Sequence, residues 1–267
     1  MAGPTTPRRR SRLPAVLGVL ILVAAALSGC ASTPPTPPGM FSFYLGEPQR
    51  PLVPGNTTES EGSKIISAVW TPLVTFDVKS RAVTYDGAAE SVTSTDNVRW
   101  TIRLKPGWTF HDGTPVTADS YVKAWNYTAL STNAQGGSYF FSNVAGYDAL
   151  QADEGGQPAA TRMWGLRSAD PTTIEVTLSA PFAIYPVTLG YSAFDPLPEV
   201  FYADPAAFGK KPIGQGPFQA ATEWVPGHGM TLTRYDNYAG KDKAKSRGVV
   251  MRMYTELSTG YTDVLAG

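Results

Sequence analysis

The chain has 267 residues, of which 42% are hydrophobic, and its 22 basic and 22 acidic side chains balance. This is the composition of an ordinary globular protein, and it argues against a nucleic-acid-binding protein, which would need a basic surface. The single cysteine excludes a disulfide within the chain, so the folded body must be held by its own hydrophobic core.

Residues 1–29 have the layout of a secretory signal. The arginines of Arg8–Arg12 form its positive region, Leu13–Leu27 forms its apolar region, and the small residues Ser28 and Gly29 stand at the expected cleavage point. The apolar run is ~15 residues long, whereas a membrane-spanning helix needs roughly 20. Removing this segment takes away four arginines and no acidic residue, which leaves 18 basic and 22 acidic side chains.

Cys30 directly follows the small residues, and this arrangement resembles the lipobox of bacterial lipoproteins. The resemblance implies that Cys30 becomes the new N-terminus and carries a diacylglycerol that holds the protein at the membrane. The alternative is an ordinary secretory signal with an incidental cysteine, and either general or twin-arginine export fits the doubled arginines. Residues 30–39 hold four prolines and are expected to form an extended tether.

The folded part is expected to begin near Met40 and to open with short strands and two helices. Apolar and polar residues alternate over Val98–Leu104 with the period of a half-buried strand, and Thr117 is a good N-cap for the second helix. The expected elements are strands over Met40–Leu45, Leu73–Phe76 and Val98–Leu104, and helices over Ser60–Trp70 and Thr117–Leu130.

The second half of the chain repeats this mixture. We expect a weak helix over Asn143–Leu150, a strand over Ile174–Leu178, a short helix or turn over Pro181–Leu189, strands over Phe218–Ala221, Met230–Arg234 and Val249–Tyr254, and the start of a helix from Thr262. Many short strands with few helices favour an α/β or α+β body built on a mixed sheet.

Three short motifs resemble catalytic, metal-binding or phosphate-binding sequences, but none of them is complete. Phe110–Pro115 places His beside Asp, but Asp-Gly favours a turn there, and a metal site would need more ligands. Gly190–Phe194 resembles a broken nucleophile elbow around Ser192, with only His228 downstream as a base. Gly214–Pro217 lacks the Lys that follows the glycines of a phosphate loop. We therefore expect no catalytic set, no metal site and no cofactor.

Three longer motifs occur in a fixed order. Val69–Val74 reads V-W-T-P-L-V, Leu104–Asp119 reads L-K-P-G-W-T-F-H-D-G-T-P-V-T-A-D, and Pro212–Phe218 reads P-I-G-Q-G-P-F. Together they resemble the family 5 substrate-binding proteins of ABC importers, the group that binds oligopeptides and dipeptides. Leu52–Pro54 lacks the aspartate usual in that group, and Val92 replaces a usual tryptophan, which affects the choice of ligand subclass more than the family.

The resemblance implies an α/β fold like that of periplasmic binding proteins, with two lobes joined by a hinge and the ligand enclosed between them. Residues 40–267 would then form most of lobe one, and the chain would stop before lobe two.

The resemblance also implies ligand contacts in two segments of this lobe. Glu47, Pro48 and Gln49 follow the first strand, and Tyr139 and Phe140 lie in a loop where similar proteins present a contacting tyrosine. The alternative for Glu47 is a solvated loop acid, and the alternative for Tyr139 and Phe140 is local packing.

The function implied is that of an extracytoplasmic binding protein, not an enzyme, anchored to the membrane by lipid on Cys30. It would capture oligopeptides or dipeptides and pass them to the permease of an ABC importer. Two alternatives remain: the same fold binding a sugar, an opine or a metal chelate, and an exported hydrolase. No nucleic-acid partner is expected.

Overall fold

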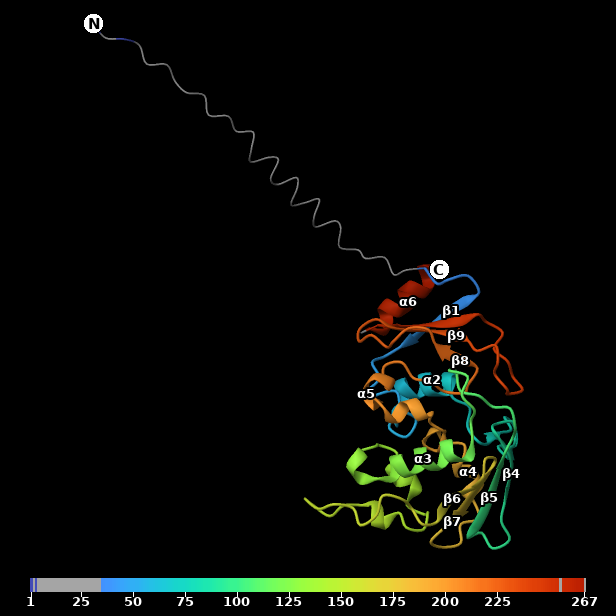
Figure 1. Cartoon of the computed structure of the whole chain (residues 1–267). Helices are drawn as coiled ribbons and strands as arrows, with labels where there is room; N and C mark the ends of the chain where they lie inside the picture. The colour runs from blue at the N-terminus through green and yellow to red at the C-terminus, as the bar shows by residue number, and fades with distance from the viewer. Residues whose placement is uncertain (2, 4–34, 255, 267) are drawn as a thin grey trace. The chain divides into compact units, whose positions relative to one another are not determined.

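Strands from both ends of the folded part meet in one sheet, so the chain leaves this sheet, builds a second one and returns (Figure 1). The computed structural model describes residues 1, 3, 35–254 and 256–266. By its contacts the chain divides into Met1–Pro35 and Thr36–Gly267, and every element below belongs to the second unit. Cys30 and the apolar run before it lie outside the described residues.

The first sheet has the strand order β1-β10-β9-β8. Its strands are β1 (Met40–Leu45), β10 (Gly248–Met253), β9 (Gly229–Arg234) and β8 (Phe218–Ala220). Strand β1 pairs in parallel with β10, and the other two pairings are antiparallel. All four strands confirm the sequence prediction to within one residue at each end. Gly229 is required where β9 begins, because its φ is 104° and a Cβ there would lie 1.9 Å from the Met251 carbonyl oxygen.

The second sheet is antiparallel throughout and has the order β4-β5-β7-β6. Its strands are β4 (Ala89–Thr93), β5 (Arg99–Leu104), β7 (Thr173–Thr177) and β6 (Leu166–Asp170). The two central strands, β5 and β7, confirm the prediction. The two edge strands were not predicted, because β6 buries only Leu166 and β4 carries too few apolar residues to show a period.

A two-stranded sheet pairs β2 (Thr75–Phe76) with β3 (Val83–Thr84). The strand predicted over Leu73–Phe76 therefore keeps only its last two residues. Leu73 and Val74 instead lie in the core before the strand starts.

Helix α2 (Ser60–Val69) confirms the predicted helix and ends one residue earlier than expected. Its apolar face buries Ile65, Ile66 and Val69. Trp70 caps its C-terminal end, and the Trp70 indole N–H donates to the Pro196 carbonyl oxygen at 2.9 Å. The helix is thereby fixed to a segment far along the chain.

Helix α3 (Ala118–Ala129) begins directly after Thr117, as predicted. The Thr117 backbone N–H donates to Ser120 Oγ at 3.2 Å, which closes the first turn. The helix packs against β6 and β7 and fully buries Tyr121 and Trp125. The Trp125 indole N–H donates to the Phe194 carbonyl oxygen at 3.0 Å, so this large core residue has its polar atom satisfied.

One predicted helix is absent, and another is present but begins earlier than expected. No α-helix covers Asn143–Leu150: Val144 forms an isolated bridge with Leu178, and only residues 148–150 form a 3₁₀ turn. The last helix, α6 (Leu257–Ala266), begins at Leu257 rather than at Thr262. Two short helices complete the described part, α4 (Tyr185–Thr188) within the predicted helix or turn and α5 (Pro205–Phe208), which was not predicted.

One cluster of buried side chains extends through both four-stranded sheets and the helices between them. Its centre is aromatic, with the Trp125 ring 5.3 Å from Phe194 and 5.9 Å from Phe141. Within residues 35–254 and 256–266, no helix has the length and apolar composition that crossing a membrane requires.

Candidate functional site

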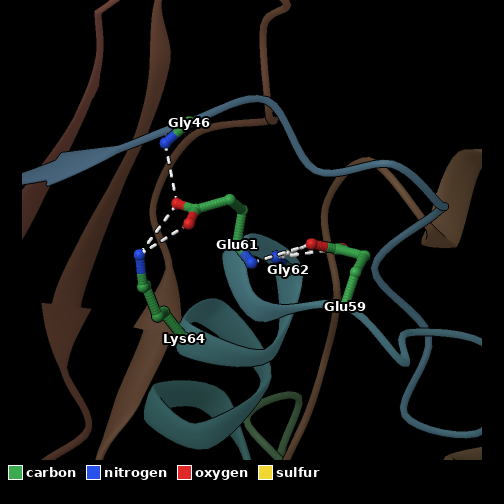
Figure 2. Close-up of polar contacts among 5 residues, drawn as sticks. All are labelled: Gly46, Glu59, Glu61, Gly62 and Lys64. Atoms are coloured by element: carbon green, nitrogen blue, oxygen red, sulfur yellow. Dashed lines mark hydrogen bonds and ion pairs between the residues drawn. The ribbon is translucent and has the colours of Figure 1, made fainter. Parts of the chain in front are cut away.

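The end of strand β1 is held to the start of helix α2 by a carboxylate (Figure 2). The Gly46 backbone N–H donates to Glu61 Oε2 at 2.8 Å, and Lys64 Nζ lies 2.8 Å from Glu61 Oε1. Glu59 caps the same helix by accepting from the backbone N–H groups of Glu61 and Gly62 at 2.7 and 3.0 Å. The hydrogen bond from Lys64 is the main reason that the pKa of Glu61 is lowered, and the Gly46 N–H lowers it further. An ionised Glu61 thus fixes where the predicted ligand-contacting segment begins.

Glu47 is bonded to the loop between β8 and β9. Its carboxylate accepts from the Trp224 indole N–H at 2.8 Å and from the Gly227 backbone N–H at 3.2 Å. The side chain is exposed, so it resembles the solvated loop acid of the alternative interpretation, yet it has a structural task. Pro48 is half-buried and Gln49 is exposed. Ligand contact by Glu47, Pro48 and Gln49 stays a prediction.

The structure brings the two predicted segments onto neighbouring loops through Asn56. The Asn56 Oδ1 atom accepts from Arg50 Nη1 at 3.3 Å and from the Gly136 backbone N–H at 3.1 Å. Next to it, the Gly137 N–H donates to the Gly55 carbonyl oxygen at 2.8 Å. The loop after β1 and the loop before Tyr139 therefore pack against each other, although they are distant in the sequence.

Tyr139 and Phe140 belong to an aromatic cluster with an exposed outer side. The two rings stack with centroids 4.5 Å apart, and Phe140 also contacts Tyr191 at 5.0 Å. Tyr139 is 60% exposed and Tyr191 is 55% exposed, whereas Phe140 is half-buried against Phe194. Local packing explains Phe140 but leaves most of both tyrosine rings open to solvent. Below, "aromatic cluster" means Tyr139, Phe140 and Tyr191.

Sequence reasoning missed Tyr191 and Arg50 as members of this surface. Tyr191 lies in Gly190–Phe194, which drew attention only because of Ser192. Arg50 directly follows the predicted Glu47–Gln49 segment. A cationic residue next to a predicted ligand contact is the sequence signal that could have identified it.

The motifs that suggested catalysis do not assemble a catalytic set in the described part of the chain. No hydrogen bond there joins Ser192 to either histidine side chain, and His228 is exposed in the turn before β9. Residues 35–254 and 256–266 contain no group of three His, Cys, Asp or Glu residues that could hold a metal ion. Asp112 and Gly113 form the predicted turn, with a φ of 84° at Gly113 and the Thr114 N–H donating to Asp112 Oδ1 at 2.9 Å.

His111 links two of the long motifs instead. The Gly214 N–H donates to His111 Nδ1 at 3.2 Å, and His111 Nε2 lies 3.1 Å from the Gly216 carbonyl oxygen. Because Nδ1 accepts, the ring proton must be on Nε2, which donates to Gly216, so the imidazole is neutral. Burial lowers the pKa of His111 to about 4, in agreement with that neutral form.

Two of the larger surface hollows in the described part lie away from the aromatic cluster. One of about 440 Å³ lies over β5 and β7 beside Trp164, and one of about 340 Å³ lies along the outer side of α3. Neither is lined by Glu47, Tyr139 or Tyr191. Glu47, Tyr139 and Tyr191 are each exposed and lie in neither hollow.

Comparison with known proteins gives consistent matches. The family model described as "Bacterial extracellular solute-binding proteins, family 5 Middle" matches residues 84–267. Periplasmic oligopeptide-binding protein OppA of Escherichia coli (strain K12) is 29% identical over 185 residues, which cover 67% of this chain and 32% of that protein. Dipeptide-binding protein DppE of Bacillus subtilis (strain 168) is 26% identical over 177 residues, covering 65% and 32%.

The fold also matches solved structures. The murein tripeptide binding protein MppA of Escherichia coli superposes with a TM-score of 0.74 at 20% identity, covering 85% of this chain and 44% of that one. The chain thus spans less than half the length of these relatives. The likeness confirms the mixed α/β fold predicted from the sequence, as part of one lobe of a two-lobed periplasmic binding protein.

Proposed function

Because this chain belongs to the bacterial extracellular solute-binding proteins of family 5, we propose that it captures peptides outside the cytoplasm and passes them to the permease of an ABC importer. The peptide assignment is supported by the relatives, whose names specify oligopeptide, dipeptide and murein tripeptide binding.

The observation that carries this proposal within the structure is the open aromatic cluster. Two tyrosine rings, each more than half exposed, flank Phe140, and the segment before Tyr139 is hydrogen-bonded to the loop after β1. Large aromatic side chains gathered on a surface mark a place where another molecule binds. Aromatic walls accept varied apolar side chains, which suits a ligand class whose members share only a backbone and charged ends.

In this proposal the aromatic cluster and the loop after β1 (Glu47–Arg50) form one wall of the binding site, and the second lobe supplies the other wall. In a two-lobed binding protein the ligand favours the closed form because it contacts both lobes at once. Two carboxylates hold the end of β1 in this wall in place. Glu61 accepts from the Gly46 N–H, and Glu47 accepts from Trp224 and Gly227. Because this wall is already ordered, less conformational entropy is lost when a ligand binds. More of the free energy of the ligand contacts is then available to close the two lobes.

Thermal denaturation with peptide pools tests the binding function in the protein expressed from its complete reading frame. We expect a peptide at 100 times its dissociation constant to add about 2.7 kcal/mol to the free energy of unfolding. The peptide should be recovered uncleaved, and Ser192→Ala should respond identically. Stabilisation by a sugar and by no peptide would contradict the peptide assignment. Peptide cleavage that Ser192→Ala abolishes would contradict the binding function.

We also propose that lipid on Cys30 anchors the protein to the outer side of the cell membrane. Two acyl chains meet the requirement that stable anchoring needs more than one lipid signal. In cells, the unmodified protein should sediment with membranes and incorporate labelled palmitate, and Cys30→Ser should be soluble and unlabelled. An identical distribution of the two proteins would support the ordinary secretory signal instead.

A further inference from the structure

Arg50 is an exposed cation held in place by a buried side chain. Its Nη1 atom donates to Asn56 Oδ1 at 3.3 Å, and Asn56 is only 8% exposed. The same Oδ1 atom accepts from the Gly136 N–H at 3.1 Å, so the position of Asn56 is fixed from a second loop. The guanidinium is therefore hydrogen-bonded to a side chain whose own position is fixed.

The Arg50 guanidinium packs against the loop that carries the aromatic cluster. A Cβ at Gly136 would lie 3.4 Å from Arg50 Cζ, so the absence of a side chain there lets the guanidinium approach the backbone. A Cβ at the next residue, Gly137, would lie 3.4 Å from the Ala193 Cβ, two residues after Tyr191. The Phe140 N–H donates to the Gly137 carbonyl oxygen at 3.1 Å. Arg50 thus contacts the segment that leads into the aromatic cluster.

The acidic side chains close to Arg50 in sequence are engaged elsewhere. Glu47 accepts from Trp224 and Gly227. Glu59 caps helix α2, and Glu61 pairs with Lys64. No carboxylate of the described residues forms an ion pair with Arg50. A guanidinium has five N–H donors in a planar fork, and most of those of Arg50 remain available.

We propose that Arg50 binds a carboxylate of the ligand, and that the adjacent aromatic cluster takes the apolar side chain next to that carboxylate. A peptide with a free C-terminus and an apolar or aromatic last residue has this chemistry. Arginine suits the task because its fork matches the two oxygens of a carboxylate. This inference rests on the proposed function and assigns one end of the ligand to this wall.

Matched peptides test the inference in the protein expressed from its complete reading frame. Calorimetry would compare Ala-Ala-Phe with a free carboxylate and as the C-terminal amide, for the unmodified protein, Arg50→Gln, Arg50→Lys and the control Arg81→Gln. We expect the unmodified protein and Arg81→Gln to bind the acid about tenfold more tightly than the amide, as one charge-assisted contact predicts. Arg50→Gln should bind both peptides equally, and Arg50→Lys should keep part of the preference.

The outcomes separate this inference from the function on which it rests. Tight binding of both peptides without preference, or a preference that persists in Arg50→Gln, would overturn the role of Arg50 and leave peptide binding intact. Binding of neither the acid nor the amide by the unmodified protein would overturn both. An unchanged melting temperature of Arg50→Gln without peptide shows that any loss comes from the missing contact and not from misfolding.

Discussion

When the pH falls from 6.5 to 4, the variant His111→Gln is expected to lose about 3 kcal/mol less of its free energy of unfolding than the unmodified protein. Burial lowers the pKa of His111 from 6.5 to about 4 in the folded state. Over this interval the unfolded chain takes up a proton on His111 and the folded chain does not. Acid therefore favours unfolding, and the stability contributed by the neutral ring is lost as the pH falls through this window.

The geometry around His111 explains why the folded state resists protonation. A second ring proton would have to sit on Nδ1, which faces the N–H of Gly214 at 3.2 Å. The ring also packs edge-on against Tyr235, with centroids 4.8 Å apart. Protonation would remove the hydrogen bond from the Gly214 N–H to Nδ1 and set two N–H donors against each other there.

Urea denaturation of the complete protein at several pH values from 4 to 7.5 measures this effect. Glutamine keeps an N–H that can reach the Gly216 carbonyl oxygen but cannot titrate, so the slope with pH is the informative quantity, and not the stability at one pH. His228→Gln is the control, because His228 is exposed in a turn. Parallel pH curves for the unmodified protein and His111→Gln would show that His111 is not the buried neutral group described above.

The variant Asp195→Asn is expected to be more stable than the unmodified protein at pH 7. Asp195 is 4% exposed, and its Oδ1 atom has no hydrogen-bond partner among the described residues. Burial raises the pKa of Asp195 well above its usual value of 3.8. The hydroxyl of Tyr121 and the side chain of Gln215 are also buried there. Burial raises the pKa of Tyr121, and the proximity of Asp195 raises it further.

The pH dependence of stability caused by Asp195 has the opposite sign to that caused by His111. Above about pH 4 the unfolded chain loses the Asp195 proton and the folded chain keeps it, so stability falls as the pH rises. The loss is about 1.4 kcal/mol for each pH unit, until the pH passes the folded-state pKa. Asparagine is neutral in both states and fills almost the same space, so the variant avoids this loss.

The same urea series, extended to pH 8, tests the Asp195 prediction. The stability difference between Asp195→Asn and the unmodified protein should be smallest near pH 4 and should grow with pH. Asp153→Asn, a change at an exposed loop aspartate, should follow the unmodified protein throughout. A constant difference across this range would mean that Asp195 is ionised in the folded state and has an unidentified counter-charge.

Because the two groups act in opposite directions between pH 4 and 6.5, the unmodified protein should show a flatter pH profile than either variant. His111→Gln should expose the loss caused by Asp195, and Asp195→Asn should expose the loss caused by His111. The double variant should differ from the unmodified protein by the sum of the two single changes, since their effects add when the groups do not interact.

The sequence predicted correctly the helices and strands that show their full apolar alternation or their capping residue within a few positions. The alternation over Val98–Leu104 predicted β5, and Thr117 predicted the start of α3 at the correct residue. The strands that pair into the first sheet were predicted one by one, because each has a short apolar run or an apolar and polar alternation of its own. Their parallel and antiparallel order required the structure, since β1 and β10 are joined only by tertiary contacts.

The failures have a common physical cause. Edge strands β4 and β6 bury too few side chains to show a period, and their pairing with β5 and β7 supplies the stability that their own residues lack. Residues 143–150 have weak helix-forming residues, and the bridge from Val144 to Leu178 decides their conformation. In both cases a distant partner overrode local preference.

For the candidate site, the sequence by itself determined the family resemblance, and that resemblance predicted ligand contacts in Glu47–Gln49 and Tyr139–Phe140. Only the tertiary structure decided that the loops next to these segments are joined, because the Asn56 side chain accepts hydrogen bonds from Arg50 and Gly136 at the same oxygen. The tertiary structure also placed Tyr191 beside Phe140 and formed the hydrogen bond that the Trp224 indole N–H donates to the Glu47 carboxylate. A sequence records which groups can donate, accept or stack, and only the folded backbone fixes which of them come within a few ångströms of each other.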